Sequence, residues 1–207
     1  MKNTILTLGI SALVSTVSQG ATMAQYLHTA TTSSKVATSV AAGVTASNFV
    51  SVGNDDGDYR TTFGSADYPG TNVWKTNNHN QGASADIGAA GPVTTSYLGF
   101  SLAATNVGEA IDLDTLSFEW GIANSLASTQ SSDANYRLFA STNGGATFVN
   151  MGTDTFTDSS IAPSAAVIAP TASIDLTSLG AQTAVEFRLF LWDVGGSPSI
   201  AKHPVRF

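Results

Sequence analysis

Three oxygen-bearing side chains alternate in one short acidic segment, at Asn54, Asp56 and Asp58. Side chains at this spacing could bring three oxygen ligands to one calcium ion. An EF-hand loop, however, has Gly directly after the third ligand and a Glu further on, whereas Tyr59 follows Asp58 here. The segment therefore has two interpretations, a weak calcium site and an ordinary acidic turn, and the turn is favoured.

Tryptophan side chains are a second group of candidate functional residues, because an indole face offers a flat apolar surface on which a sugar ring can stack. Trp120 is in phase with Leu116 and Phe118, which predicts a place in the core. Trp74 lies in an Asn-rich segment, and Trp192 ends an apolar stretch. These two are the candidate ligand-binding residues for a carbohydrate, Trp74 before Trp192. The alternative is that Trp74 covers one end of the fold.

Two carboxylates, Glu119 and Glu186, stand on predicted strands that could be neighbours, so they could form the acid pair of a glycosidase. Arg137 and Arg188 are available as cross-strand partners, and an ion-pair face is the favoured interpretation. The three His are scattered, and no Ser lies in a nucleophile elbow. No catalytic residue is predicted, and a jelly-roll polysaccharide-processing enzyme remains the alternative.

The charge and the cysteine count of the chain disfavour nucleic-acid binding and exclude cysteine-dependent chemistry. The net charge is −7, and the 8 Lys and Arg residues form no cluster that could neutralise the phosphates of a nucleic acid, so a nucleic-acid partner is disfavoured. Without Cys there is no disulfide framework, thiol nucleophile or thiolate metal site. Calcium is the only cofactor that the residues suggest.

The N-terminus reads as a secretory signal over residues 1–20. Lys2 supplies the positive charge, and the apolar run from Ile5 to Val17 is too short to span a bilayer. Small residues at Ser18 and Gly20 predict cleavage after Gly20, with cleavage after Ala21 or after Ala24 as alternatives. The expected mature chain, residues 21–207, has no transmembrane segment and is long enough for a single β-sandwich domain.

Period-two alternation of apolar residues predicts the strands of that domain. The clearest predicted strands are 97–103, 116–120, 136–141, 146–151 and 185–192. Apolar residues on both faces of 185–192 indicate a central strand. Residues 25–50 predict one or two loose strands, and residues 53–92 are mostly loop with two short strands. The expected fold class is all-β, an antiparallel, jelly-roll-like β-sandwich.

The predicted hairpin turn carries the pattern Ser141-Thr142-Asn143-Gly144-Gly145-Ala146-Thr147-Phe148, which resembles an Asp-box with Asn for Asp and Phe for Trp. In that motif the polar side chains tie down a turn, and the motif is framework. Residues 111–116 and 174–179 also echo each other, which predicts two equivalent corners of the sandwich.

Several framework stretches together resemble the bacterial exported β-sandwich proteins called PEP-CTERM proteins. They are residues 40–49, 97–102, 111–121, 174–179 and 185–190. The family's sorting tail is absent, and residues 204–207 resemble the start of its last strand, so a C-terminal strand cut short is expected. The resemblance implies a secreted or cell-surface, non-catalytic protein, tied to the exopolysaccharide matrix or to other surface components, with carbohydrate binding as one such role.

Overall fold

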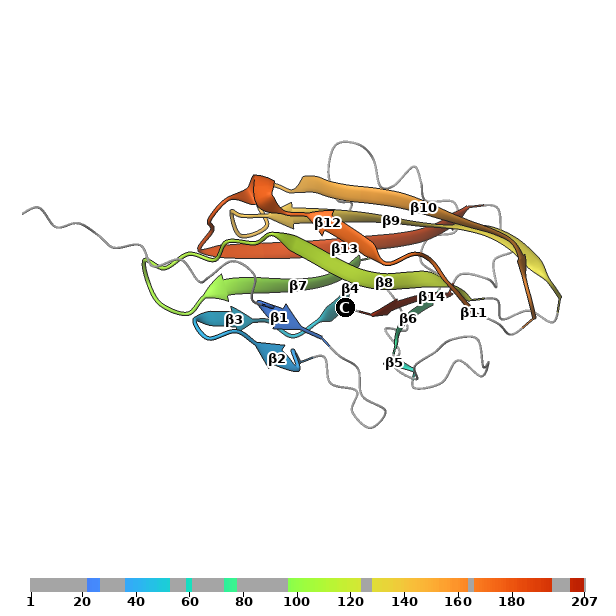
Figure 1. Cartoon of the computed structure of the whole chain (residues 1–207), viewed down its shortest axis with the longest axis horizontal. Helices are drawn as coiled ribbons and strands as arrows, with labels where there is room; N and C mark the ends of the chain where they lie inside the picture. The colour runs from blue at the N-terminus through green and yellow to red at the C-terminus, as the bar shows by residue number, and fades with distance from the viewer. Residues whose placement is uncertain are drawn as a thin grey trace, which may run out of the picture.

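The structure is a computed structural model, and it describes residues 22–26, 36–52, 59–60, 73–77, 97–123, 128–163, 166–194 and 202–206. Within these residues two six-stranded sheets and a two-stranded ribbon are formed, and every strand pairing is antiparallel. Their inner faces share one hydrophobic core, with the layers overlapping in the view of Figure 1. The predicted all-β antiparallel sandwich is confirmed.

The first sheet, called sheet I here, runs in the order β10-β9-β13-β7-β3, with β4 also paired to β7. Its strands are β3 (Val44–Ala46), β4 (Val50–Val52), β7 (Tyr97–Ala104), β9 (Gln130–Ser141), β10 (Val149–Ile161) and β13 (Ala184–Val194). Because β13 lies between β7 and β9, the prediction of a central strand there is confirmed.

The second sheet, sheet II, runs in the order β11-β8-β14-β6-β5, with β12 also paired to β8. Its strands are β5 (Tyr59–Arg60), β6 (Val73–Asn77), β8 (Thr115–Ala123), β11 (Ala166–Ile168), β12 (Ala172–Asp175) and β14 (Lys202–Arg206). The ribbon consists of β1 (Ala24–Gln25) and β2 (Ser39–Val40). β5 and β6 are the two short strands expected within 53–92.

The alternation of apolar and polar residues along the strands determines which side chains are buried in the core. Leu98, Phe100 and Leu102 of β7 are all buried, as are Phe118 and Trp120 of β8. Trp120 contacts the ring of Tyr136 edge-on at 4.8 Å, and its indole N–H donates to the Pro170 carbonyl at 3.2 Å. A buried Trp needs such a partner for its N–H group, so Trp120 is a core residue, as predicted.

The two echoing segments lie side by side in sheet II. Asp175 pairs with Thr115, and the Leu176 amide donates to the Asp114 carbonyl at 2.8 Å. After β12 the chain enters a short 3-10 helix, Thr177–Leu179. The Asp175 carboxylate accepts from the Thr177 hydroxyl at 2.6 Å, which lowers the pKa of Asp175. The two echoing segments thus meet at one corner of the sandwich, whereas two equivalent corners were predicted.

Candidate functional site

The outward face of sheet I carries polar and aromatic side chains at its centre. On β13, Glu186 and Arg188 alternate with core residues and so stand on the outer face. Glu186 lies between Ser101 of β7 and Ser141 of β9 in the pairing register. The structure therefore gathers side chains from three strands around the middle of β13.

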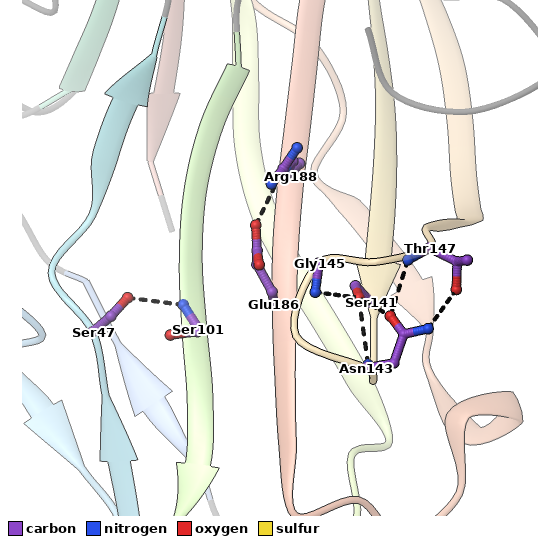
Figure 2. A network of polar contacts seen from close by, with 8 residues as sticks. All are labelled: Ser47, Ser101, Ser141, Asn143, Gly145, Thr147, Glu186 and Arg188. Carbon is purple, nitrogen blue, oxygen red and sulfur yellow. Dashed lines mark hydrogen bonds and ion pairs between the residues drawn. The ribbon is translucent and has the colours of Figure 1, made fainter. Parts of the chain in front are cut away.

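Arg188 is held by three side chains at once. Its Nε donates to Glu186 Oε1 at 2.8 Å, a contact drawn in Figure 2. Its guanidinium carbon lies 4.5 Å from the Tyr97 ring centroid and 4.1 Å from that of Phe148. A planar guanidinium stacks favourably on aromatic faces, so both rings fix the arginine while it fixes the carboxylate.

A small aromatic cluster supports this arrangement. Phe139 and Phe190 are buried and contact each other edge-on at 5.6 Å, and Tyr97 lies 5.7 Å from Phe190. Gly99 is needed below Tyr97, because a Cβ atom there would lie 3.0 Å from the Tyr97 ring and 3.3 Å from a backbone oxygen. Tyr97 therefore has a fixed position on the outer face.

The β9–β10 turn packs against the other side of Glu186. The Ser141 hydroxyl donates to Asn143 Oδ1 and accepts from the Gly145 amide, both at 2.9 Å. Asn143 also binds Thr147 twice, through its side-chain amide at 2.8 Å and through the Thr147 amide at 3.0 Å. Figure 2 shows these contacts closing the turn. The Asp-box-like residues thus tie down a hairpin, as predicted.

Gly144 and Gly145 provide the backbone conformation of this turn, with φ angles of 70° and 84°. A Cβ atom at Gly145 would lie 3.0 Å from Glu186 Oε2. The glycine pattern therefore serves two purposes: it allows the left-handed turn, and it lets the backbone approach the carboxylate closely.

A shallow groove of about 380 Å³ runs beside Glu186 toward the β3–β4 edge. Tyr97 and Val50 give it apolar surface, and Ser47, Asn48 and Glu186 give it polar groups. Ser47 is fixed because its hydroxyl accepts from the Ser101 amide at 2.8 Å (Figure 2). An aromatic surface with an amide, hydroxyls and a carboxylate around it is the chemistry that binds a sugar.

The predicted ligand-binding residues belong to different sheets. Trp74 belongs to β6 of sheet II, where it pairs with Val205, and Trp192 belongs to β13 of sheet I, where it pairs with Asn135. Their side chains lie outside the described part of the molecule, so their part in binding stays a prediction.

The predicted calcium ligands Asn54, Asp56 and Asp58 lie outside the described residues. Within the described ranges, no group of three or more His, Cys, Asp or Glu side chains is placed to hold a metal ion. The calcium interpretation therefore stays a prediction about the segment 53–58.

The prediction that Glu119 and Glu186 lie on neighbouring strands is wrong. Glu119 is on β8 of sheet II, whereas Glu186 is on β13 of sheet I, because β13 finds its partners in β7 and β9. The predicted ion pair of Glu186 with Arg188 exists, although it runs along one strand and does not cross between strands. The proposed acid pair thus has no geometric basis.

Sequence reasoning missed the groove residues Ser47, Asn48 and Tyr97. Alternation along β13 was enough to place Glu186 and Arg188 on the same face of the sheet. Which residues lie beside them depends on which strands pair with β13. The one local signal was Gly99 two residues after Tyr97, since a glycine in a strand often marks a close approach.

No family model and no curated protein matches this chain. Among solved structures, the K1 cleaved adhesin domain of Lys-gingipain from Porphyromonas gingivalis W83 matches with 16% identity and a TM-score of 0.36. The match covers 81% of this chain and 89% of that chain. At this TM-score the likeness contributes nothing to the function proposed below, and the resemblance to PEP-CTERM proteins stays a prediction.

One further finding concerns membranes. Among the described residues, no helix is long and apolar enough to cross a bilayer.

Proposed function

We propose that this protein is a non-catalytic, exported β-sandwich of the cell surface or extracellular matrix, and that it binds polysaccharide in the groove on the outer face of sheet I. The observation that carries the proposal is the fixed position of Tyr97 and Glu186 in the lining of a groove that also presents Ser47 and Asn48. Preorganised aromatic and polar groups lower the entropic cost of binding a flexible glycan.

The non-catalytic part of the proposal is supported by the groove's described lining, which contains a single carboxylate, Glu186. One of its oxygens already accepts from Arg188. Glycoside hydrolysis ordinarily needs two carboxyl groups across the scissile bond. A carboxylate engaged in this way suits the orientation of sugar hydroxyls better than proton transfer.

Export is supported by the N-terminal signal pattern of residues 1–20, with Lys2 followed by the apolar run from Ile5 to Val17. The secretory route is tested by expressing the full chain in a bacterial host and locating it in the cytoplasmic, periplasmic and medium fractions. Retention of uncut chain in the cytoplasm would contradict the localisation.

Affinity electrophoresis of the full chain in gels containing a panel of neutral and acidic polysaccharides tests the binding proposal. At least one polysaccharide is expected to retard the protein. Asn48→Ala and Tyr97→Leu are expected to weaken retardation by about tenfold, which is ~1.4 kcal/mol. Asn106→Ala is the matched control, because Asn106 is an exposed amide in a turn away from the groove.

Two further variants decide between the groove and the predicted tryptophans. If Trp74→Ala or Trp192→Ala abolishes retardation while Asn48→Ala and Tyr97→Leu do not, the groove is the wrong site. If no polysaccharide retards the chain, the binding proposal fails. Melting temperatures of all variants must stay above the temperature of the assay, because Tyr97 also packs against Arg188 and Phe190.

A further inference from the structure

The groove on the outer face of sheet I has a single charged group in its described lining, the carboxylate of Glu186. Arg188 Nε donates to Oε1 of this carboxylate at 2.8 Å, yet Arg188 is absent from that lining. The Glu186 side chain is 31% exposed and the Arg188 side chain only 16%. A ligand in the groove therefore meets the negative member of the ion pair first.

The positive member of the pair is held outside the groove. The guanidinium carbon of Arg188 lies 4.5 Å from the Tyr97 ring centroid and 4.1 Å from the Phe148 ring centroid. Tyr97 is itself fixed, with its ring centroid 5.7 Å from that of Phe190. Turning Arg188 toward a ligand would break both ring contacts and the bond to Glu186, so its charge stays where it is.

This arrangement opposes an anionic ligand. The carboxylate of Glu186 lines the groove and the guanidinium does not, so repulsion of a ligand carboxylate exceeds its attraction to Arg188. A ligand carboxylate would also lose hydration, and no basic side chain in the described lining replaces the lost water. The net charge of −7 on the whole chain acts in the same direction.

An uncharged sugar suits the same groups. Glu186 can only accept hydrogen bonds, and sugar hydroxyls can donate them. Hydrogen bonds to an ionised acceptor are about twice as strong as those between neutral groups. Asn48 is exposed and offers an amide N–H and a carbonyl oxygen, while Val50, 44% exposed, offers apolar surface. A hydroxyl can satisfy both polar side chains, whereas a ligand carboxylate cannot donate to Glu186.

From these observations we infer that the groove takes a neutral polysaccharide and rejects one whose sugar residues carry carboxylates, with Glu186 as the residue that makes this selection. The inference rests on the proposed polysaccharide-binding function and adds the substrate class to it. Arg188 contributes by holding the carboxylate in place and not by contact with the ligand.

Calorimetric titration of the full chain with matched pairs of polymers tests the inference. The hydroxyethyl and carboxymethyl derivatives of dextran, cellulose and galactomannan are compared at one ionic strength, because the two substituents are similar in size and differ in charge. For at least one backbone the hydroxyethyl derivative is expected to bind, and its carboxymethyl counterpart should bind about tenfold more weakly.

A substitution at Glu186 assigns the selection to that residue. Glu186→Gln keeps the size of the side chain, removes the negative charge and leaves the charge of Arg188 unbalanced. The carboxymethyl derivative should bind this variant about tenfold more tightly than it binds the unchanged chain. Asp114→Asn is the matched control, since it removes an equal charge at an exposed residue outside the groove lining. It should leave the preference unchanged.

The outcomes separate this inference from the function on which it rests. Carboxymethyl derivatives that bind as tightly as hydroxyethyl ones would overturn the neutral selection and leave polysaccharide binding standing. A preference that Glu186→Gln does not reduce would show that Glu186 is not its source. Absence of binding by every derivative, or binding that Asn48→Ala leaves intact, would overturn the groove as a polysaccharide site and the inference with it.

Discussion

The two faces of β13 differ in what their residues do. On the inner face Val185, Phe187, Leu189 and Leu191 are all buried in the main core. On the outer face Glu186 and Arg188 are partly exposed, and Phe190 is buried in a separate cluster. One strand thus holds the sandwich together with one set of residues and positions polar groups with the other.

Substitution on the inner face of β13 should therefore affect stability first, and substitution on its outer face should affect binding first. Inner-face contacts are apolar and many, so their loss lowers the free energy of unfolding most. Outer-face contacts are few and directional, and they are coupled through Arg188. Their loss should therefore weaken binding in the groove more than it lowers the free energy of unfolding.

Phe187→Ala should have the largest effect, a loss of about 3–5 kcal/mol in the free energy of unfolding, because it leaves a cavity in the inner face. Phe187 is 1% exposed and stacks on Phe100. Urea denaturation followed by tryptophan fluorescence measures the loss. Val149→Ala, at a residue 61% exposed, is the control and should change stability little. Similar losses in the two variants would contradict the assignment of Phe187 to the core.

Arg188→Met should cost about 2 kcal/mol, since it removes the contacts with the Tyr97 and Phe148 rings and the bond to Glu186. Arg188→Lys keeps the charge but loses the planar stacking, so it should recover only part of that loss. Both should weaken polysaccharide retardation more than their stability loss explains. Full recovery by lysine in both measurements would mean that the stacking is unimportant.

Ser141→Ala should cost about 1–2 kcal/mol, because it leaves the amide of Gly145 and Oδ1 of Asn143 without the hydroxyl in a partly buried turn. Thermal unfolding measures the change. Thr142→Ala, at the exposed neighbouring residue, is the control. Equal effects of the two substitutions would show that the hydroxyl network does not stabilise the turn.

Tyr26→Phe should cost about 1 kcal/mol at neutral pH through loss of the hydroxyl bond to Ser47. Burial raises the pKa of Tyr26 from 10.0 to about 12. The folded state therefore favours the neutral phenol, and its contribution is complete below pH 10.0 and is lost as pH rises toward about 12. Melting temperatures across that range should fall less steeply for Tyr26→Phe than for the unchanged chain. Parallel curves would contradict the burial of this hydroxyl.

Much of the fold could be predicted because its signals are local. Alternation of apolar residues predicted β7, β8 and β13, and the Asn143-Gly144-Gly145 turn predicted the β9–β10 hairpin. The site was less predictable. The bond between Glu186 and Arg188 joins residues two apart on one strand, but Tyr97 and Ser47 reach them only through the pairing of β13 with β7 and the arrangement of β3 and β4 at the edge.

The period of the strands and the turn that needs positive φ angles were predictable from the sequence alone, because each depends on a residue and its near neighbours. The disfavoured nucleic-acid partner followed from composition, because the chain has no cluster of positive charge. The folded chain was needed to show that Glu119 and Glu186 lie in different sheets and that Arg188 lies against two aromatic rings. These features come from pairing between strands far apart in the chain, and backbone preference does not specify a strand's partner.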